Sequence, residues 1–96
     1  MINKEYILNI LTSNKLELFE KYPLSSLCLF GSFARNDFRE ESDIDILVDF
    51  NAPVGIRFID LADELENILH RKVDLVSKGG IRPKYFNEIK KDLIYV

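Results

Sequence analysis

The chain has 96 residues, of which 47% are hydrophobic and 30% are charged, with 13 Lys and Arg against 16 Asp and Glu and a net charge of −3. This length and composition are typical of one globular domain, which we expect to span residues 1–96. An acidic chain argues against stable, non-specific binding of DNA or RNA, because such binding depends on neutralising phosphates.

The charge is unevenly distributed along the chain. Residues 71–96 carry seven basic and three acidic side chains, whereas the first 70 residues carry six basic and 13 acidic ones. The basic segment is either an ordinary solvated surface or a local site for a triphosphate, an RNA or an acidic partner.

Several features indicate a cytoplasmic protein. Cys28 is the single cysteine, which rules out an internal disulfide, and its apolar neighbours predict that it is buried. The start of the chain lacks the basic and apolar segments of a signal peptide. No apolar run approaches the roughly 20 residues that span a bilayer. We therefore expect no association with membranes.

The first predicted element is helical. Residues 3–22 place Ile7, Leu11 and Leu18 on one stripe at helical spacing. Asn14 and Glu17 resemble a capping pair, so the run is either one helix or two, the second starting at Asn14. Pro23 ends the helical pattern.

The remaining elements alternate between strand and helix. The pattern predicts strands over 26–30, 43–50 and 73–76, a helical turn over 33–35, a loop over 36–42, helices over 55–69 and 83–92, a turn at 79–80 and a candidate edge strand at 95–96. The second long helix is expected to face inward through Phe58, Ala62, Leu65 and Leu69. This alternation indicates an α/β or α+β domain with a small mixed sheet flanked by helices.

Three acidic residues occupy unusual positions on the predicted strands. Asp43 and Asp45 are two residues apart, so both carboxylates point to the same face of the strand. Ile44 and Ile46 would then point to the core. Asp74 lies inside an apolar strand, where a carboxylate is costly unless something compensates it.

Neighbouring strands would bring these three carboxylates together, and at least one would hold its proton unless a cation intervenes. Mg²⁺ takes carboxylate and phosphate oxygens. Two such ions can clamp the attacking and leaving oxygens of a phosphoryl displacement. The acids therefore predict a metal site formed by Asp43, Asp45 and Asp74, with two Mg²⁺ ions.

Gly31 and Ser32 come directly after a predicted strand and before a helical turn. Such a turn presents free backbone N–H groups and the positive end of a helix, and a glycine lets a phosphate approach the backbone closely. The Ser32 hydroxyl can also donate to a phosphate oxygen. We therefore expect this turn to bind the β- and γ-phosphates of a nucleoside triphosphate.

The sequence from Phe30 to Arg35 (FGSFAR), followed by Asp43-Ile44-Asp45, resembles the signature of the DNA polymerase β-type nucleotidyltransferase superfamily. Ten residues separate Ser32 from Asp43, a spacing similar to that of the minimal nucleotidyltransferases (MNT). That group includes the antitoxins of prokaryotic HEPN–MNT toxin–antitoxin pairs. The resemblance runs through most of the chain. This chain departs from the resembled family at Asn36, where the family usually has glycine. Asparagine tolerates a left-handed backbone better than most residues, so we expect the turn to survive.

The resemblance implies the nucleotidyltransferase fold and transfer of AMP from ATP to a tyrosine of a HEPN ribonuclease toxin, which makes the chain an antitoxin. Asp43 and Asp45 would ligate the metals, and Asp74 would ligate the metal nearest the acceptor and help to remove its proton. Gly31, Ser32 and Arg35 would bind the nucleotide.

Each of these residues also has a structural interpretation. Asp43 and Asp45 could be solvated acids at a strand start, and Asp74 could pair with Lys72 or Lys78. Ser32 could be an N-cap. Arg35 could pair with Glu40 or Glu41, a role that we favour slightly over phosphate binding. His70 is expected to cap a helix end rather than to bind metal, and Asp49 is expected to lie in solvent.

Two other functions stay open. The chain could be an antitoxin that neutralises its partner by binding alone, although a pure binder has no need to collect three carboxylates. It could also transfer nucleotides to a small molecule. The lack of a second domain in 96 residues argues against that reaction, unless a homo-oligomer builds the pocket.

Overall fold

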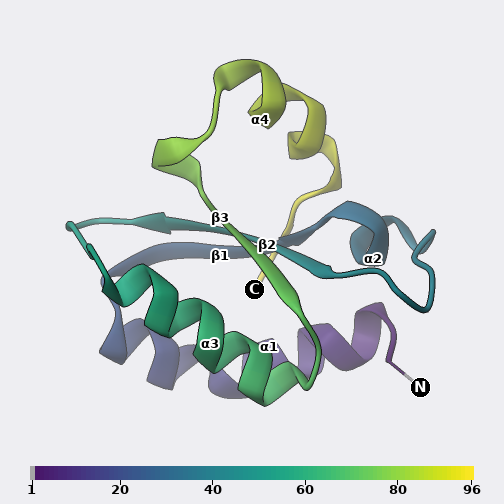
Figure 1. The fold of residues 1–96 in the computed structure, drawn as a ribbon, viewed down its shortest axis with the longest axis horizontal. Coiled ribbons are helices and arrows are strands. Elements are labelled where there is room, and N and C mark those ends of the chain that lie inside the picture. Colours follow the sequence, from purple (N-terminus) through teal and green to yellow (C-terminus); the bar gives the residue numbers. More distant parts are fainter. Residues whose placement is uncertain (1) are drawn as a thin grey trace.

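The computed structural model describes residues 2–96 and contains a four-stranded sheet with helices on both sides (Figure 1). The elements follow one another as α1 (Lys4–Lys21), β1 (Leu24–Phe30), α2 (Gly31–Arg35), β2 (Ile44–Phe50), α3 (Arg57–Leu69), β3 (Val73–Ser77), η1 (Lys78–Gly80), α4 (Pro83–Ile89), η2 (Lys90–Asp92) and β4 (Ile94–Tyr95), where η marks a 3₁₀ turn. The expected α/β architecture with a small mixed sheet is confirmed.

The strand order is β3-β2-β1-β4. Strand β1 runs antiparallel to both β2 and β4, whereas β2 and β3 are parallel, with α3 as the crossover between them. Phe30, the last residue of β1, pairs with Asp45 of β2, which in turn pairs with Asp74 of β3. The sheet register therefore aligns the end of β1 with two of the predicted site residues.

One face of the sheet carries the larger core. Helices α1 and α3 lie together on this side (Figure 1). Ile44, Ile46 and Val48 of β2 point toward them and are fully buried, as alternation along the strand predicts. The intervening residues of β2, Asp45 among them, consequently point to the opposite face.

The opposite face is covered by α4, which lies across the sheet from α1 and α3 (Figure 1). Its core is a smaller cluster in which Ile89 of α4 packs with Cys28, Phe30 and Leu47. Cys28 is buried, as expected, and burial raises the pKa of its thiol to about 11. This second cluster fixes α4 on the face of the sheet that carries the acidic residues.

Helix α1 is a single helix rather than two. Asn3 caps its start, with its Oδ1 accepting from the backbone N–H of Tyr6 at 2.9 Å. Asn14 does not begin a second helix, because its side chain donates to the carbonyl of Ile10 at 2.8 Å and the backbone continues through it. Buried Leu11 and Leu18 on either side hold the two halves of the helix to one core.

Several predicted boundaries shift by a few residues. Strand β1 begins at Leu24 rather than at residue 26, and the edge strand β4 is Ile94–Tyr95 rather than residues 95–96. The regular part of α4 ends at Ile89, and the 3₁₀ turn η2 replaces its predicted last turn. In α3 the fully buried stripe is Leu61, Leu65 and Leu69, so Leu61 takes the place predicted for Ala62.

His70 forms the C-cap of α3 with a left-handed backbone, φ 53°, as its predicted capping role requires. Asp49 is partly buried rather than fully solvated, and its Oδ1 accepts from the backbone N–H of Phe50. Within residues 2–96, none of the helices has the length and apolar character needed to cross a lipid bilayer.

The core supports a direct test of stability. Leu65→Ala removes a fully buried side chain and is expected to lower the free energy of unfolding by about 2–5 kcal/mol. Leu16→Ala makes the same chemical change on α1, where the side chain is 80% exposed, and should cost less than about 0.5 kcal/mol. Urea unfolding followed by circular dichroism measures both, and equal losses would contradict the assigned core.

Candidate active site

Two of the three predicted acids lie side by side in the sheet. Asp45 and Asp74 are register partners on the parallel strands β2 and β3, so both side chains leave the sheet on the α4 face. Asp45 is partly buried, whereas Asp74 is exposed. The predicted juxtaposition of strand-borne carboxylates is therefore present for this pair.

The pair is strained electrostatically. The pKa of Asp45 is raised to about 6, with burial as the largest cause. The charge of Asp74, a hydrogen bond with Asp74 and the charge of Asp43 act in the same direction, while the charge of Arg35 opposes them. The sequence predicted that at least one of these carboxyl groups would hold its proton unless a cation intervenes. The pKa of Asp45 moves in that direction, but a value of about 6 leaves the carboxyl group mostly ionised at pH 7. Desolvation contributes more to the raised pKa than repulsion does.

Asp43 precedes β2 by one residue and is exposed, close enough for its charge to act on Asp45. In the part of the chain that the structure describes, no group of three or more Asp, Glu, His or Cys side chains is gathered into a metal-binding cluster. The structure thus places Asp45 and Asp74 together and leaves Asp43 at the rim of the pair.

Arg71 holds the loop that leads into Asp43. Its Nε donates to the carbonyl of Ser42 at 2.7 Å, and its Nη2 donates to the carbonyl of Glu40. Its guanidinium also lies 5.2 Å from the ring centroid of Phe33 in α2. This arginine, which the sequence analysis did not single out, therefore connects α2, the loop and the entry to β3.

Gly31 begins α2 directly beside the Asp45 carboxyl group. Its φ is +75°, a conformation that side chains rarely adopt. A Cβ at this position would overlap Oδ2 of Asp45 and lie 2.8 Å from its Cγ. Position 31 thus requires glycine for two independent reasons, and the strand-to-helix turn and the acid pair are in direct contact.

Ser32 is the second residue of α2 and is partly buried. The N-cap of α2 is Phe30, without a side-chain hydrogen bond, so the alternative that Ser32 is an N-cap is wrong. The first N–H groups of the helix have no partner within the helix. These N–H groups begin next to Asp45, so backbone hydrogen-bond donors lie beside the carboxylates.

Asn36 ends α2 in the left-handed conformation, with φ 65°, and its N–H bonds the carbonyl of Ser32. The asparagine therefore preserves the turn at the position where the resembled family usually has glycine. The short helix is fixed on its inner side by fully buried Phe33, whose ring stacks on Phe38 with centroids 4.3 Å apart.

Arg35 is exposed and forms two ion pairs. Its Nε donates to Asp37 Oδ2 at 3.0 Å and its Nη1 to Asp92 Oδ2 at 3.2 Å. The predicted pairing with Glu40 or Glu41 is wrong, because Asp37 is nearer along the loop and η2 brings Asp92 to α2. These contacts hold the guanidinium at the edge of the site, where its charge acts on Asp45.

The alternative that Asp74 is a salt-bridge partner finds no support. Among residues 2–96, the ion pairs within 4.0 Å involve Lys21 and Arg35, and neither Lys72 nor Lys78 pairs with Asp74. The ammonium group of Lys78 lies instead 5.1 Å from the ring centroid of Phe86 in α4. The charge of Asp74 acts instead on the second carboxyl group, that of Asp45.

Tyr85 of α4 is a neighbour of the acids that sequence reasoning missed. Its side chain is 41% exposed, and burial, followed by the charges of Asp45 and Asp74, raises the pKa of its phenol. The signal in the sequence was the spacing of four between Tyr85 and Ile89, which puts both on one helix face.

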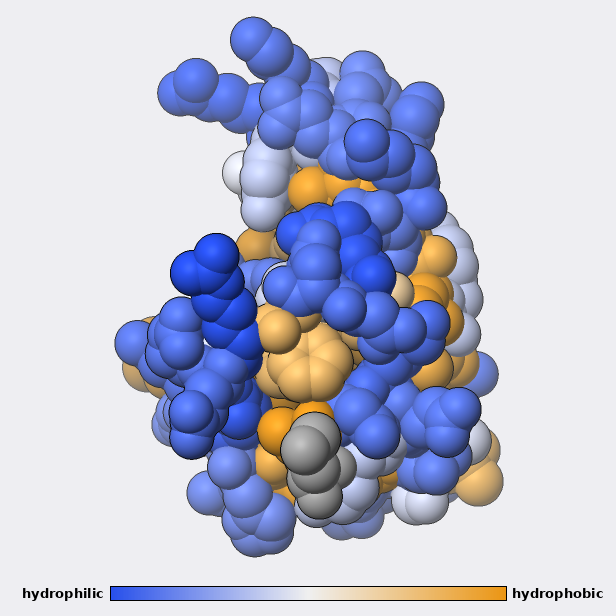
Figure 2. Space-filling model, turned by 90° about the vertical axis from the view of Figure 1, so that its right-hand side faces the viewer, coloured by the Kyte–Doolittle hydropathy of each residue, from blue (hydrophilic) through white to orange (hydrophobic). Residues whose placement is uncertain are grey.

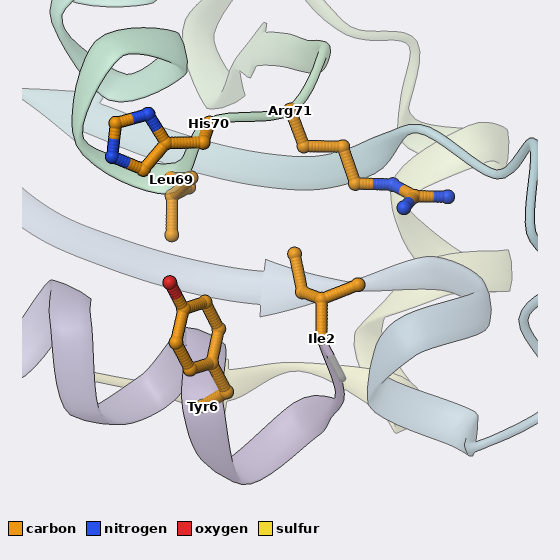
Figure 3. A pocket seen from close by; sticks show the side chains of 5 residues that line it. All are labelled: Ile2, Tyr6, Leu69, His70 and Arg71. Carbon is orange, nitrogen blue, oxygen red and sulfur yellow. The ribbon is translucent and has the colours of Figure 1, made fainter.

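Two hollows in the surface lie away from the acid pair. One, of about 260 Å³, is lined by Ile2, Tyr6, Leu69, His70 and Arg71, and Figure 3 shows it between the start of α1 and the end of α3. A second, of similar size, lies beside the start of α1 and the end of α2, lined by Asn3, Lys4, Glu5 and Asn36. The paired carboxylates line neither of these two hollows.

Figure 2 shows the side of the molecule on which α2 lies: most of it is hydrophilic, with a hydrophobic patch near its centre and further hydrophobic atoms above the centre and toward the edges. A surface of this kind suits a charged, hydrated ligand better than an apolar one.

Comparison with known proteins is consistent with this geometry. The model of the nucleotidyltransferase domain family matches residues 13–96. MJ0128 of Methanocaldococcus jannaschii, named for an inferred protein adenylyltransferase activity, is 49% identical over 92 residues, which cover 94% of each chain. The protein adenylyltransferase MntA of Thermococcus cleftensis is 38% identical over 97 residues, which cover 100% of this chain and 98% of MntA.

Solved structures share the fold. An inferred minimal nucleotidyltransferase superposes with a TM-score of 0.82 at 29% identity, covering 99% of this chain and 97% of that chain. A toxin–antitoxin structure with AMP-PNP superposes with a TM-score of 0.70 at 25% identity, covering 98% of this chain and 72% of that chain.

The contact between Gly31 and Asp45 predicts a large effect of adding one methyl group. Gly31→Ala combines an unfavourable φ with the clash, and should lower the free energy of unfolding by about 2–4 kcal/mol. Gly55→Ala is a matched control, since Gly55 also has a positive φ, +54°, but has open space around it, and should cost only about 1 kcal/mol. Chemical denaturation compares them; similar losses would show that no clash exists.

The raised pKa of Asp45 predicts a pH-dependent stability. Between pH 3.8 and about 6, the folded chain holds a proton that the unfolded chain has released, so the free energy of unfolding falls as the pH rises through this interval. Asp45→Asn removes this loss and should stabilise the domain by about 1 kcal/mol more at pH 7 than at pH 4, after allowance for solvent screening.

The measurement is denaturation in EDTA at both pH values. Asp49→Asn, on the same face of the same strand, controls for the change in net charge. A gain for Asp45→Asn that is equal at pH 4 and pH 7 would contradict the shifted pKa.

Proposed function

Because this chain belongs to the nucleotidyltransferase domain family, we propose that it is a Mg²⁺-dependent protein adenylyltransferase that moves AMP from ATP to a tyrosine of a HEPN-type toxin and acts as the antitoxin. The observation that carries the proposal is the contact between the Gly31 turn and the Asp45–Asp74 pair. This contact joins a phosphate-binding element to a set of metal-binding oxygens.

The carboxylates suit Mg²⁺ chemically. Asp45 and Asp74 present hard oxygen donors side by side, and burial together with the charge of Asp74 raises the pKa of Asp45, which favours a cation at this position. Asp43, Asp45 and Asp74 are the residues that would hold the metal. Bound Mg²⁺ would supply positive charge to the α-phosphate and to the departing pyrophosphate.

The residues of the chain itself bind and orient the reactants. The backbone N–H groups that begin at Gly31, together with the Ser32 hydroxyl, donate to the β- and γ-phosphates. Arg35, held at the rim by Asp37 and Asp92, adds a positive charge near the same phosphates. Asp74, the more exposed of the paired acids, faces the side from which an acceptor enters and takes its proton.

The relatives support a protein as the acceptor. MntA of Thermococcus cleftensis is a protein adenylyltransferase, and a toxin–antitoxin structure with AMP-PNP has the same fold as this chain. The exposure of Asp74 supports a protein acceptor, because a side chain on a partner's surface can reach this carboxylate.

The test is transfer of label from ATP that is labelled at the α-phosphate. The chain is incubated with Mg²⁺ and the HEPN-type protein encoded beside it, and we expect label on the partner. Asp43→Asn, Asp45→Asn and Asp74→Asn should each reduce transfer at least about a hundredfold, because catalysis here depends on charge neutralisation and positioning. Circular dichroism should show that each variant stays folded.

Asp49→Asn is the matched control, since it removes an acid from the same strand outside the pair and should leave transfer unchanged. Loss of the partner's ribonuclease activity without any label would favour neutralisation by binding alone. Label on an added aminoglycoside, with none on the partner, would instead favour a small-molecule transferase. Either result would contradict the proposal.

A further inference from the structure

We propose that the chain also adenylylates itself, with Tyr85 of α4 as the acceptor within the same molecule. This inference rests on the proposed transferase function and adds a modification site on the enzyme. It follows from the place of Tyr85 in the fold, from the positions of the other tyrosines and from the chemistry of a phenol on the same face of the sheet as the acid pair.

Tyr85 lies on the face of α4 that is turned toward the sheet. Ile89, one helical turn later, is buried against Phe30 and Leu47 on the α4 face of the sheet. Residues four apart in a helix lie on the same side, so Tyr85 points in the same general direction as Ile89. Phe86, between them, is also partly buried against this cluster.

The acids lie on the same face of the sheet as this cluster. Asp45 precedes Leu47 by two residues on β2, and Asp74 precedes Val76, another member of the cluster, by two residues on β3. The connections on either side of α4 hold it over this region, because η1 contacts β2 and η2 contacts α2. The charges of Asp45 and Asp74 both act on the Tyr85 phenol, which agrees with this placement.

The other tyrosines are placed differently. Tyr6 lies on α1, on the far side of the sheet, where it lines the hollow in Figure 3. Tyr22 is buried and its hydroxyl donates to Glu64 at 3.1 Å. Tyr95 is 66% exposed on the edge strand β4, two strands away from β2. Tyr85 is therefore the tyrosine whose phenol shares the site with the carboxylates.

The reaction uses the same substrate as the proposed transfer to the partner. The Tyr85 hydroxyl oxygen attacks the α-phosphorus of ATP and forms a new P–O bond, while the bond from the α-phosphorus to the β-phosphate oxygen breaks. Pyrophosphate leaves with the electron pair of that bond, and the phenolic proton passes to the carboxylate pair and then to water. No oxidant or reductant is needed.

The first experiment uses the full chain alone with α-labelled ATP and Mg²⁺. We expect one adenylyl group per chain, and peptide mass spectrometry should place it on Tyr85. Tyr85→Phe should lower self-labelling at least tenfold, whereas Tyr6→Phe should leave it unchanged. The two residues are a matched pair, since Tyr6 is 42% exposed and Tyr85 is 41% exposed. An adenylyl group mapped to Tyr6, Tyr22 or Tyr95 instead would overturn the inference.

A second experiment tests whether transfer occurs within one molecule. Tagged Asp43→Asn, which keeps Tyr85 but lacks a site acid, is mixed with active Tyr85→Phe chain. We expect no label on the tagged chain, and label there would show transfer between molecules and overturn the inference. Thermal unfolding of each variant confirms that the chains are folded.

Labelling of the HEPN-type partner by wild-type chain separates this inference from the proposed function. Label on the partner with none on the chain would refute self-modification and leave the proposed function in place. No label on either protein would overturn both.

Discussion

The site depends on two carboxyl groups held side by side by the pairing of parallel strands. Once β2 and β3 pair in register, Asp45 and Asp74 must leave the sheet together on the α4 face. The backbone hydrogen bonds and the buried isoleucines of β2 keep them there despite their mutual repulsion. The fold therefore maintains an unfavourable charge arrangement, which is the usual physical mark of a site that is completed by a cation or a substrate.

The rest of the site is arranged around this pair. Gly31 lacks a side chain where the Asp45 carboxyl group needs room, so the first turn of α2 begins against the acid. Arg71 holds the loop that delivers Asp43, and the Arg35–Asp92 ion pair ties α2 to the segment after α4. The smaller core under Ile89 keeps α4 on the same face without covering the carboxylates completely.

Local patterns were sufficient to predict much of this arrangement. Alternation along β2 placed Asp45 on the face opposite buried Ile44 and Ile46, and the left-handed tolerance of asparagine explained Asn36. Contacts between distant segments were not predictable, because no local pattern encodes them. Arg35 pairs with Asp92 rather than with Glu40 or Glu41, and tertiary burial keeps α1 continuous through Asn14. Tyr85 was missed for the same reason, since the acids whose charges act on it lie on β2 and β3 and not on its own helix.

The space shared by Gly31 and Asp45 also constrains how the sequence can change over generations. A side chain at position 31 would need a left-handed backbone and would force the Asp45 carboxyl group out of its present position. A replacement at position 31 therefore disturbs the turn and the acid together. A descendant that loses one of the two therefore has little selective reason to keep the other, so the pair offers a sequence marker for separating active from inactive descendants of this domain.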